Sequence, residues 1–363
     1  MTHSTRGTGV KRKKRNKTLY IIRLFIKTFL VSIGAFCVVL GIGALLFFSI
    51  AGAIVRPPDI PVPPGFESNL SLNDSTESFG PTTPERFTEE DRRELFFTFL
   101  IIGLNEGTNA NTIMVASFDG IRGEANLISI PRDSLMNVDR RIRKLSGSYM
   151  AGALGGRGRA GGVAQMQREV MSIIGFVPDF YVVLDYDAFF AIIDAVGGIE
   201  MYVPFHMRYD DPLQNLHIDI PPGLQHMNSQ TALHFARFRM SNPGFRSITD
   251  YQRIENQQAV INAVISELLS PASLLRIPEF VGVFNDSVYT NLTIGNMLWF
   301  ANQLNNIRGT DALSTHIMPT TGTTGPPMWY ELLDPPAIVE LVNQTINPYY
   351  SEVELRDLSI ITE

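Results

Sequence analysis

Four arginines are the residues of this sequence best suited to chemistry. Arg132 follows an apolar segment, in the run IPRD that ends at Asp133. Arg237 and Arg239 stand two residues apart, and Arg253 lies near the start of a predicted long helix. A guanidinium group binds two phosphate oxygens at once and keeps its charge at neutral pH. Together the four would form an anion-binding site, whereas the alternative for any one alone is a surface salt bridge.

The neighbours of these arginines suggest how the side chains are held. On a β-strand, Arg237 and Arg239 would point to the same face. Asp250, three residues before Arg253, is a plausible N-cap of the long helix. Asp133 directly follows Arg132 and is a further candidate for the reactive site.

Apolar periodicity predicts the elements that must position these side chains. Short apolar runs bounded by glycine or proline predict strands at 96–103, 112–118, 125–130, 180–184 and 199–203. Apolar residues spaced three and four apart predict helices at 163–174, 186–196, about 250–269, 292–306 and 336–346. Strands that alternate with helices indicate an α/β domain whose helices cover a largely buried sheet.

Two loop-like segments leave alternatives open. Residues 152–162 (GALGGRGRAGG) contain Arg157 and Arg159, so they could cradle a phosphate or form a mobile loop before a helix. Residues 320–327 (TTGTTGPP) have loop composition, and they could flank a pocket or form a plain surface loop.

Composition excludes several classes of protein. The chain of 363 residues has one cysteine, Cys37, which excludes a disulfide framework and a cysteine-based zinc site. Nine basic and no acidic residues precede residue 56, so the remainder carries a net charge of −15. A domain this acidic is a poor general binder of nucleic acid.

The amino-terminal region predicts a membrane anchor. Residues 28–55 contain no charged residue, and a helix of that length would span the ~30 Å hydrocarbon core of a bilayer. A cleaved signal peptide is the alternative, but its apolar region should be only about 7–15 residues long. The preceding basic residues place the amino terminus in the cytoplasm and the bulk of the chain outside the cell.

The same reading divides the chain into five parts. A basic cytoplasmic tail over 1–27 and a transmembrane helix over 28–55 come first. Residues 56–93 are rich in proline and serine, which is typical of an extended spacer. A folded domain over 94–350 and a tail over 351–363 complete the chain.

Seven sequence blocks resemble the LytR-CpsA-Psr family of envelope phosphotransferases. They occur in family order over roughly 95–270, and the short anchor, spacer and external domain are also the family's layout. The blocks are LISIPRD at 127–133, DFYVVLD at 179–185, AVGGI at 195–199, YDDP at 209–212, PG at 222–223, TALHFARFR at 231–239 and RIENQQ at 253–258.

The resemblance implies an α-β-α layered fold with a central mixed sheet, preceded by one transmembrane helix, and a deep apolar pocket for a polyprenyl chain. It implies an enzyme that moves a glycan phosphate from an undecaprenyl-pyrophosphate-linked precursor to a cell-wall hydroxyl, typically on peptidoglycan. The membrane is a further partner, and nucleic acid is not expected, although the family is also named for transcriptional attenuation. By motif position, the pyrophosphate would be held by Arg132, Arg237, Arg239 and Arg253, which with Asp133 form the candidate catalytic set.

One departure from the family pattern concerns a metal. The resemblance implies Mg²⁺ held by two aspartates, but Asn105 and Asn111 stand at those positions. Mg²⁺ prefers carboxylates and phosphate oxygens, so Glu106 or Asp133 would have to substitute. The alternative function is therefore a polyprenyl-pyrophosphate-binding protein with weak or no catalysis.

Overall fold

The fold is known from a computed structural model that describes residues 57–60, 83–105, 109–154, 156–214, 216–270, 277–303 and 313–361. The predicted tail and membrane span, residues 1–55, lie outside this set. Within these ranges, no helix is both long enough and apolar enough to cross a bilayer. Chain contacts separate Met1–Arg56 from Pro57–Glu363, and every described residue belongs to the second unit.

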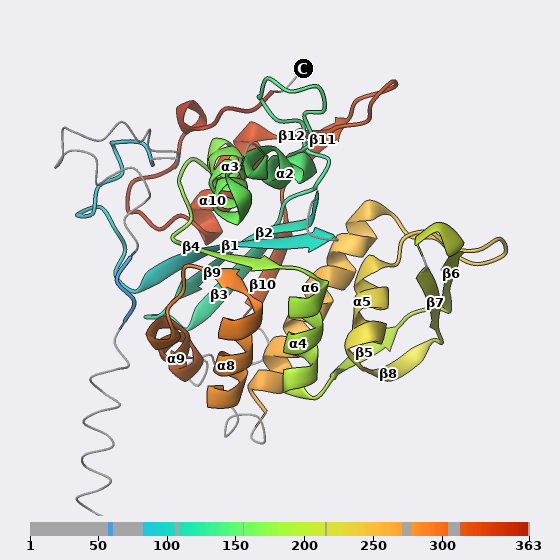
Figure 1. The fold of residues 1–363 in the computed structure, drawn as a ribbon. Helices are drawn as coiled ribbons and strands as arrows, with labels where there is room; N and C mark the ends of the chain where they lie inside the picture. The colour runs from blue at the N-terminus through green and yellow to red at the C-terminus, as the bar shows by residue number, and fades with distance from the viewer. Residues whose placement is uncertain are drawn as a thin grey trace, which may run out of the picture. The chain divides into compact units, whose positions relative to one another are not determined.

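A mixed sheet of six strands forms the centre of the domain, in the order β10-β3-β2-β1-β4-β9 (Figure 1). β1 pairs antiparallel with β2 and parallel with β4, so the longest strands lie in the middle. β10 pairs parallel with β3, and β9 pairs antiparallel with β4. The strands are β1 (Phe96–Asn105), β2 (Asn109–Asp119), β3 (Glu124–Ser129), β4 (Phe180–Leu184), β9 (Tyr289–Thr290) and β10 (Leu313–Ile317).

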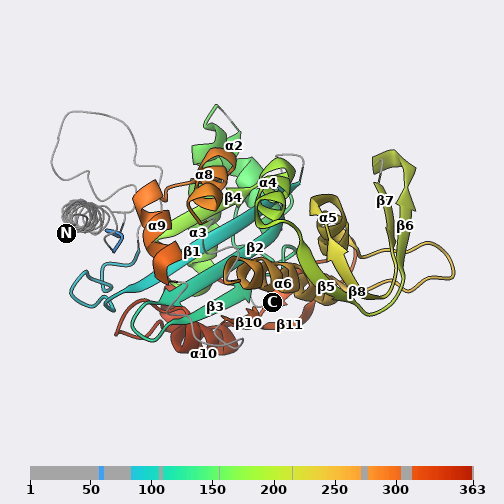
Figure 2. The same ribbon diagram turned by 90° about the horizontal axis from the view of Figure 1, so that it is seen from below.

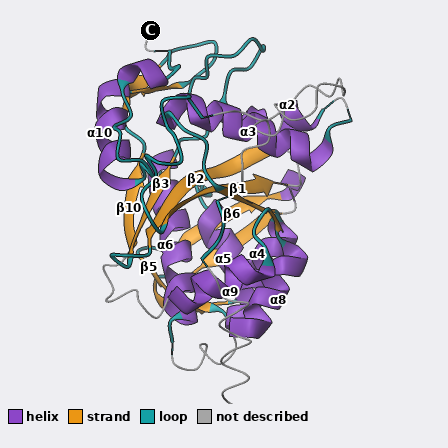
Figure 3. Cartoon of the chain, turned by 90° about the vertical axis from the view of Figure 1, so that its left-hand side faces the viewer, coloured by secondary structure: helices purple, strands orange, loops and turns teal. Residues whose placement is uncertain are grey.

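Helices cover both faces of this sheet, which confirms the predicted layered α/β fold (Figures 1 and 3). One face carries α2 (Ser148–Ala153), α3 (Gly158–Ile174) and α10 (Pro335–Thr345). The other carries α4 (Tyr186–Val196), α6 (Asp250–Leu268), α8 (Ile277–Ser287) and α9 (Ile294–Gln303). The alternation along β1 explains both layers, because Leu100 and Ile102 pack in the core beneath α3 and α10, while Phe97 and Phe99 contact Phe300 of α9.

A second apolar core lies beside the sheet (Figure 2). It joins α5 (Ser229–Arg237) and two antiparallel strand pairs, β5 (Ile199–Val203) with β8 (Gly223–Met227) and β6 (Met207–Asp211) with β7 (Leu216–Ile220). α6 connects the two cores, since Val260 packs in the second core while Gln258 Nε2 donates to Ser129 Oγ at 2.9 Å and to the carbonyl oxygen of His316 at 2.7 Å.

The segment before Arg239 is a helix, so the strand geometry considered for Arg237 and Arg239 does not apply. Asn228 caps α5 by accepting a hydrogen bond from the Thr231 amide at 2.9 Å. The apolar residues that follow are spaced three and four apart, and Ala232, Leu233, Phe235 and Ala236 are buried. Arg237 is therefore the last residue of a helix, and Arg239 lies in the segment after it.

The glycines of residues 152–162 serve helix packing, which neither earlier alternative anticipated. A Cβ atom on Gly152 would lie 2.2 Å from the carbonyl oxygen of Gly161, and one on Gly162 would lie 2.9 Å from the Tyr149 ring. Side chains at these positions would force α2 and α3 apart.

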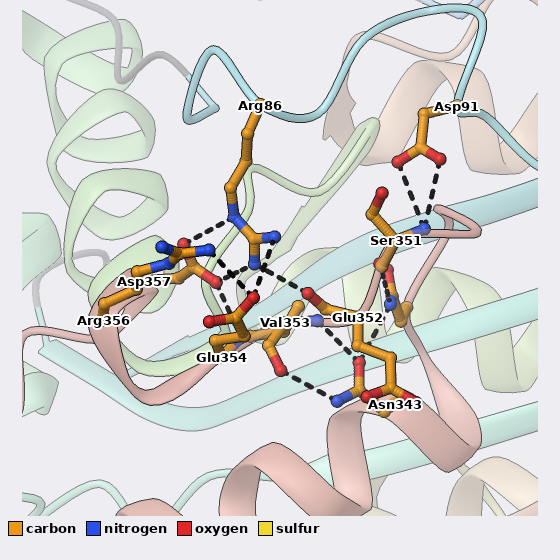
Figure 4. A network of polar contacts seen from close by, with 10 residues as sticks. Arg86, Asp91, Asn343, Ser351, Glu352, Val353, Glu354, Arg356 and Asp357 are labelled. Atoms are coloured by element: carbon orange, nitrogen blue, oxygen red, sulfur yellow. Dashed lines mark hydrogen bonds and ion pairs between the residues drawn. The ribbon is translucent and has the colours of Figure 1, made fainter.

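Residues 83–93 pack on the carboxyl-terminal segment, so the predicted boundaries at 93 and 351 were misplaced (Figure 4). Arg86 Nε donates to Asp357 Oδ1 at 2.9 Å, and the Ser351 amide donates to Asp91. Phe87 stacks on Tyr349 with ring centroids 4.7 Å apart. The polar composition of these residues suggested a spacer and a tail, but hydrogen bonds and the ion pair between Arg86 and Asp357 join the two segments.

Candidate active site

A cavity of about 300 Å³ opens between the end of β1 and helices α4, α5 and α6. Its lining includes all four predicted arginines, Arg132, Arg237, Arg239 and Arg253, which we call the arginine cluster. The rest of the wall is largely apolar and includes Leu184, Phe189, Leu216, Leu233, Val260 and Ile261. The cavity therefore places a concentration of positive charge next to an apolar wall.

Separate elements bring the cluster together. Arg132 lies in a turn just after β3, which the Ser134 hydroxyl closes by donating to the Pro131 carbonyl oxygen at 2.7 Å. Arg253 lies in the first turn of α6, whose N-cap is Thr249 with a reciprocal capping box to Gln252. Arg237 and Arg239 come from the end of α5 and the residues after it. The end of α5 and the start of α6, together with the turn after β3, therefore set the positions of the four arginines.

Asp250 is the shared counter-ion of three of these arginines. Its Oδ1 lies 3.0 Å from Arg253 Nη2, 3.7 Å from Arg239 Nε and 3.8 Å from Arg132 Nη2. The expected N-cap role was wrong, because Thr249 caps the helix and leaves the Asp250 carboxylate to the arginines. The spacing Asp250-x-x-Arg253 at a helix start was the available signal for this role.

Arg132, Arg239 and Arg253 together carry more positive charge than the one carboxylate of Asp250 neutralises. Burial and the nearby Arg132 lower the pKa of Arg253 to about 10, against the opposing effect of Asp250. The Arg253 side chain is only 7% exposed. Arg132 Nε and Arg253 Nε are buried without a hydrogen-bond partner in the described part of the chain. Buried donors normally find acceptors, and phosphate oxygens would supply both the acceptors and the missing negative charge.

Asn111 enters the cavity through an irregularity in the β1–β2 pairing. Gly103 pairs with Thr112 but Leu104 pairs with Ala110, so Asn111 is an extra residue in the ladder. Such a bulge redirects a side chain, and it is common beside active sites. Asn111 lines the cavity, and its Oδ1 accepts a hydrogen bond from Arg132 Nη1 at 2.9 Å.

The donor atoms described here do not fit the Mg²⁺ site that the resemblance implies. Asn105 is absent from the cavity lining, and its Oδ1 accepts a hydrogen bond from the Asn109 amide at 3.0 Å. The Asn111 amide oxygen is already bonded to Arg132. In the described ranges no three of the residues histidine, cysteine, aspartate and glutamate are grouped as a metal site. Glu106 lies outside those ranges.

Asp133 does not join the cavity. Its Oδ1 forms an ion pair with Lys144 Nζ at 3.1 Å, and it is absent from the lining. The arginine next to it points elsewhere because the turn after β3 separates the two side chains. Asp133 therefore sits beside the site as a structural partner of Lys144.

Three residues of the lining were missed by the sequence analysis. Asp185 lines the cavity and caps α4 by accepting from the Ala188 amide at 3.0 Å. Tyr186 stacks under Arg237, whose Cζ lies 5.1 Å from the ring centroid. Phe189 adds apolar surface one helical turn further on. Asp185 closes one of the seven family-like blocks, which was the signal that pointed to it.

The segment 320–327 borders the site from outside. Its first residues form β11 (Thr320–Thr323), which pairs with β12 (Glu331–Leu333). Tyr251 of α6 bonds through its hydroxyl to Thr320 Oγ1 at 2.7 Å and Glu331 Oε2 at 3.2 Å. Burial raises the pKa of Glu331, as do the nearby Asp133 and Asp250. The segment is thus a hairpin that braces the start of α6.

Several proteins are similar to this chain in sequence. The Bacillus subtilis polyisoprenyl-teichoic acid–peptidoglycan teichoic acid transferase TagV is 24% identical over 63% of this chain and 60% of its own length. TagU of the same organism, which carries the same descriptive name, is 24% identical over 68% of this chain and 76% of its own length. The regulatory protein MsrR of Staphylococcus aureus is 22% identical over 54% of this chain and 56% of its own length. The chain thus spans about 60% of the length of TagV.

Solved structures share the fold. The crystal structure of B. subtilis TagV superposes with a TM-score of 0.57 at 22% identity, over 69% of this chain and 96% of that one. TagT bound to LIIa-WTA gives a TM-score of 0.55 at 17% identity, over 73% and 95%. The LytR_cpsA_psr family model matches residues 68–347, a range that contains the whole arginine cluster. The chain therefore belongs to the LytR_cpsA_psr family.

Proposed function

We propose that this protein transfers a glycan phosphate from a polyprenyl-pyrophosphate-linked precursor to a hydroxyl group of the cell wall. The observation that carries the proposal is that four arginines line one partly apolar cavity, three of them around Asp250. The names of TagV and TagU, which specify polyisoprenyl-linked teichoic acid and peptidoglycan, support a lipid-linked donor and an envelope acceptor.

The reaction balances without a nucleotide. The acceptor oxygen forms a bond to the phosphorus that carries the glycan, while the bond from that phosphorus to the bridging oxygen breaks. Polyprenyl phosphate leaves, and the proton of the acceptor hydroxyl passes to solvent. Phosphoryl transfer of this kind depends mainly on charge neutralisation and positioning.

Each part of the cavity has a role in that step. Arg253, which is buried and lacks a partner at Nε, would bind the pyrophosphate together with Arg132. Arg239, whose side chain is 45% exposed, would reach the side from which the acceptor arrives. The apolar wall near Phe189 would hold the first isoprene units. An anchor over residues 28–55, with the amino terminus in the cytoplasm, would keep the domain at the membrane that carries such a donor.

The test uses the full chain with a prenyl-pyrophosphate-linked N-acetylglucosamine and a soluble peptidoglycan fragment. Release of prenyl phosphate that requires the fragment is the expected result. Arg239→Ala should slow release by about 100-fold or more, as does the loss of one donor that stabilises transition-state charge. Arg122→Ala is the control, because Arg122 lies at the other end of β2 and is 65% exposed. Equal rates for the two variants would contradict the assignment.

The second candidate function is binding of a polyprenyl pyrophosphate without transfer. The observation that favours it is the pair of amides, Asn105 and Asn111, at the positions where the resemblance implies carboxylates. The same assay separates the candidates, because a binder retains the prenyl pyrophosphate and releases no prenyl phosphate.

A further inference from the structure

Asn111 stands at one of the two positions where the resemblance implies a metal ligand, and it pairs with Arg132 in the cavity wall. Asn111 is the bulged residue between β1 and β2, and its amide oxygen accepts from Arg132 Nη1 at 2.9 Å. The bulge orients the amide, and the amide in turn fixes one arm of the guanidinium. Arg132 Nε is buried and keeps no hydrogen-bond partner among the described residues, so it remains available to an anion.

Replacing two aspartates and a Mg²⁺ ion by two asparagines leaves the net charge of these groups unchanged. Two carboxylates and one Mg²⁺ sum to zero, and two amides without a metal also sum to zero. An aspartate at 111 would instead pair with Arg132 and remove a positive charge from the cavity. A cation site needs negative oxygen donors, whereas Asn111 offers one neutral oxygen that is already bonded.

Asn105 differs from Asn111 in its surroundings. Its amide oxygen accepts from the Asn109 backbone amide at 3.0 Å, which links the last residue of β1 to the first residue of β2. An aspartate could accept the same hydrogen bond. The chain therefore provides a matched pair of positions, of which 111 lines the cavity and 105 does not.

We propose that Asn111 is a positioning residue that holds Arg132 where it takes over the role of a divalent cation, so that this protein binds and uses the pyrophosphate without a metal. The inference rests on the proposed function for the transfer step, but it makes its own claim about binding. Arg132 then supplies charge and directed hydrogen bonds to the pyrophosphate, while Arg239 and Arg253 complete the neutralisation.

The experiment measures binding of farnesyl pyrophosphate by the full chain, with and without a chelator, for the natural protein, Asn111→Asp and Asn105→Asp. The natural protein should bind equally in both conditions, within about twofold. Asn111→Asp should weaken binding by about tenfold with the chelator, which is the loss of roughly one charged hydrogen bond. Mg²⁺ should restore part of that loss, and Asn105→Asp should behave like the natural protein.

Two results would overturn the inference. One is a natural protein that needs Mg²⁺ to bind farnesyl pyrophosphate or to release prenyl phosphate. In that case Glu106→Gln would show whether the residue next to Asn105 supplies the missing carboxylate. The other is an Asn111→Asp variant whose binding and chelator response match those of Asn105→Asp. Acquired chelator sensitivity in Asn111→Asp alone is the result that a purely structural role could not produce.

Failure of the proposed function gives a different pattern. Binding that resists the chelator, with no release of prenyl phosphate in either condition, supports the Asn111–Arg132 pair and rejects the transferase. Thermal unfolding of all variants shows whether a loss of binding reflects a loss of fold.

Discussion

Two groups of arginines lie at opposite ends of β1, and they differ in how their charge is matched. At one end, Arg132, Arg239 and Arg253 share the single carboxylate of Asp250. At the other, three arginines each pair with a different carboxylate, and one of these, Asp119, also pairs with the exposed Arg122. These paired arginines are Arg86 with Asp357, Arg92 with Asp179 and Arg93 with Asp119.

The pKa shifts follow the same division. Burial lowers the pKa of Arg92, but the Asp179 carboxylate more than offsets this and leaves the pKa above its ordinary value. The pKa of Arg253 falls instead, through burial and the repulsion of Arg132. An arginine thus stabilises the fold where it has a separate carboxylate partner, and it contributes to a binding site where three arginines share one carboxylate. The comparison also explains why arginine content alone would not have located the cavity.

The largest expected change in stability comes from removing one of the paired arginines. Arg92→Ala should lower the free energy of unfolding by about 3–5 kcal/mol, because it leaves the buried Asp179 carboxylate without its cation. Chemical denaturation with urea measures this, and farnesyl pyrophosphate binding by the folded fraction should stay unchanged. Arg122→Ala, which removes an exposed arginine from the same end, should cost less than about 1 kcal/mol. Equal losses of stability for the two variants would show that the buried Arg92–Asp179 pair contributes no more to stability than an exposed arginine.

The next effect concerns the shared carboxylate. Asp250→Asn should lower the free energy of unfolding by about 1–3 kcal/mol, because three guanidinium groups then face one another without a counter-ion. Saturating inorganic pyrophosphate should recover much of this loss by supplying the negative charge. Urea denaturation with and without pyrophosphate measures both quantities.

The control for that experiment is Asp139→Asn, which removes an exposed carboxylate that is not part of the cavity lining. It should change neither the stability nor the response to pyrophosphate. If pyrophosphate does not restore the stability of Asp250→Asn, the anion does not bind at the arginine cluster.

Much of the fold was predictable from local patterns. The helix at 186–196 and the strands at 180–184 and 199–203 are confirmed at both ends, because apolar spacing and the glycines and prolines that follow are local signals. The helix before Arg239 was not predicted, because attention to the two arginines two residues apart left the helical spacing of Leu233 and Ala236 unused. Residues 83–93 were assigned wrongly because Arg86 and Asp91 bond to Asp357 and Ser351, which lie more than 250 positions away.

The candidate site was predictable in its members but not in its arrangement. The family-like blocks identified the four arginines, and the cavity contains all of them. The blocks could not show that Asp250 forms ion pairs instead of capping α6. That depends on Thr249 being the N-cap residue. The bulge at Asn111 was equally hidden, because a one-residue shift in register depends on how two strands pair.

The smallest expected effect is the pH dependence of the ion pair between Arg86 and Asp357. Burial raises the pKa of Asp357, but its hydrogen bond to Arg86 more than offsets this and holds the pKa below its ordinary value (Figure 4). The ion pair therefore stabilises the fold above the unfolded-state pKa of about 4, and this contribution disappears as the pH falls through the lower folded-state pKa. Asp357→Asn should cost about 1 kcal/mol at neutral pH, since the Arg86 partner is partly exposed.

The measurement is thermal unfolding of the natural protein and Asp357→Asn from pH 7 down to about pH 3. The difference in melting temperature between the two should shrink as the carboxylate takes up its proton. A difference that is constant across this range would mean that Asp357 acts through its neutral contacts with the Glu354 backbone rather than through charge. At the arginine cluster no such acid transition is expected from an added pyrophosphate, because its phosphate oxygens keep negative charge well below neutral pH. The arginines at the two ends of β1 should therefore differ both in their response to acid and in their response to an added anion.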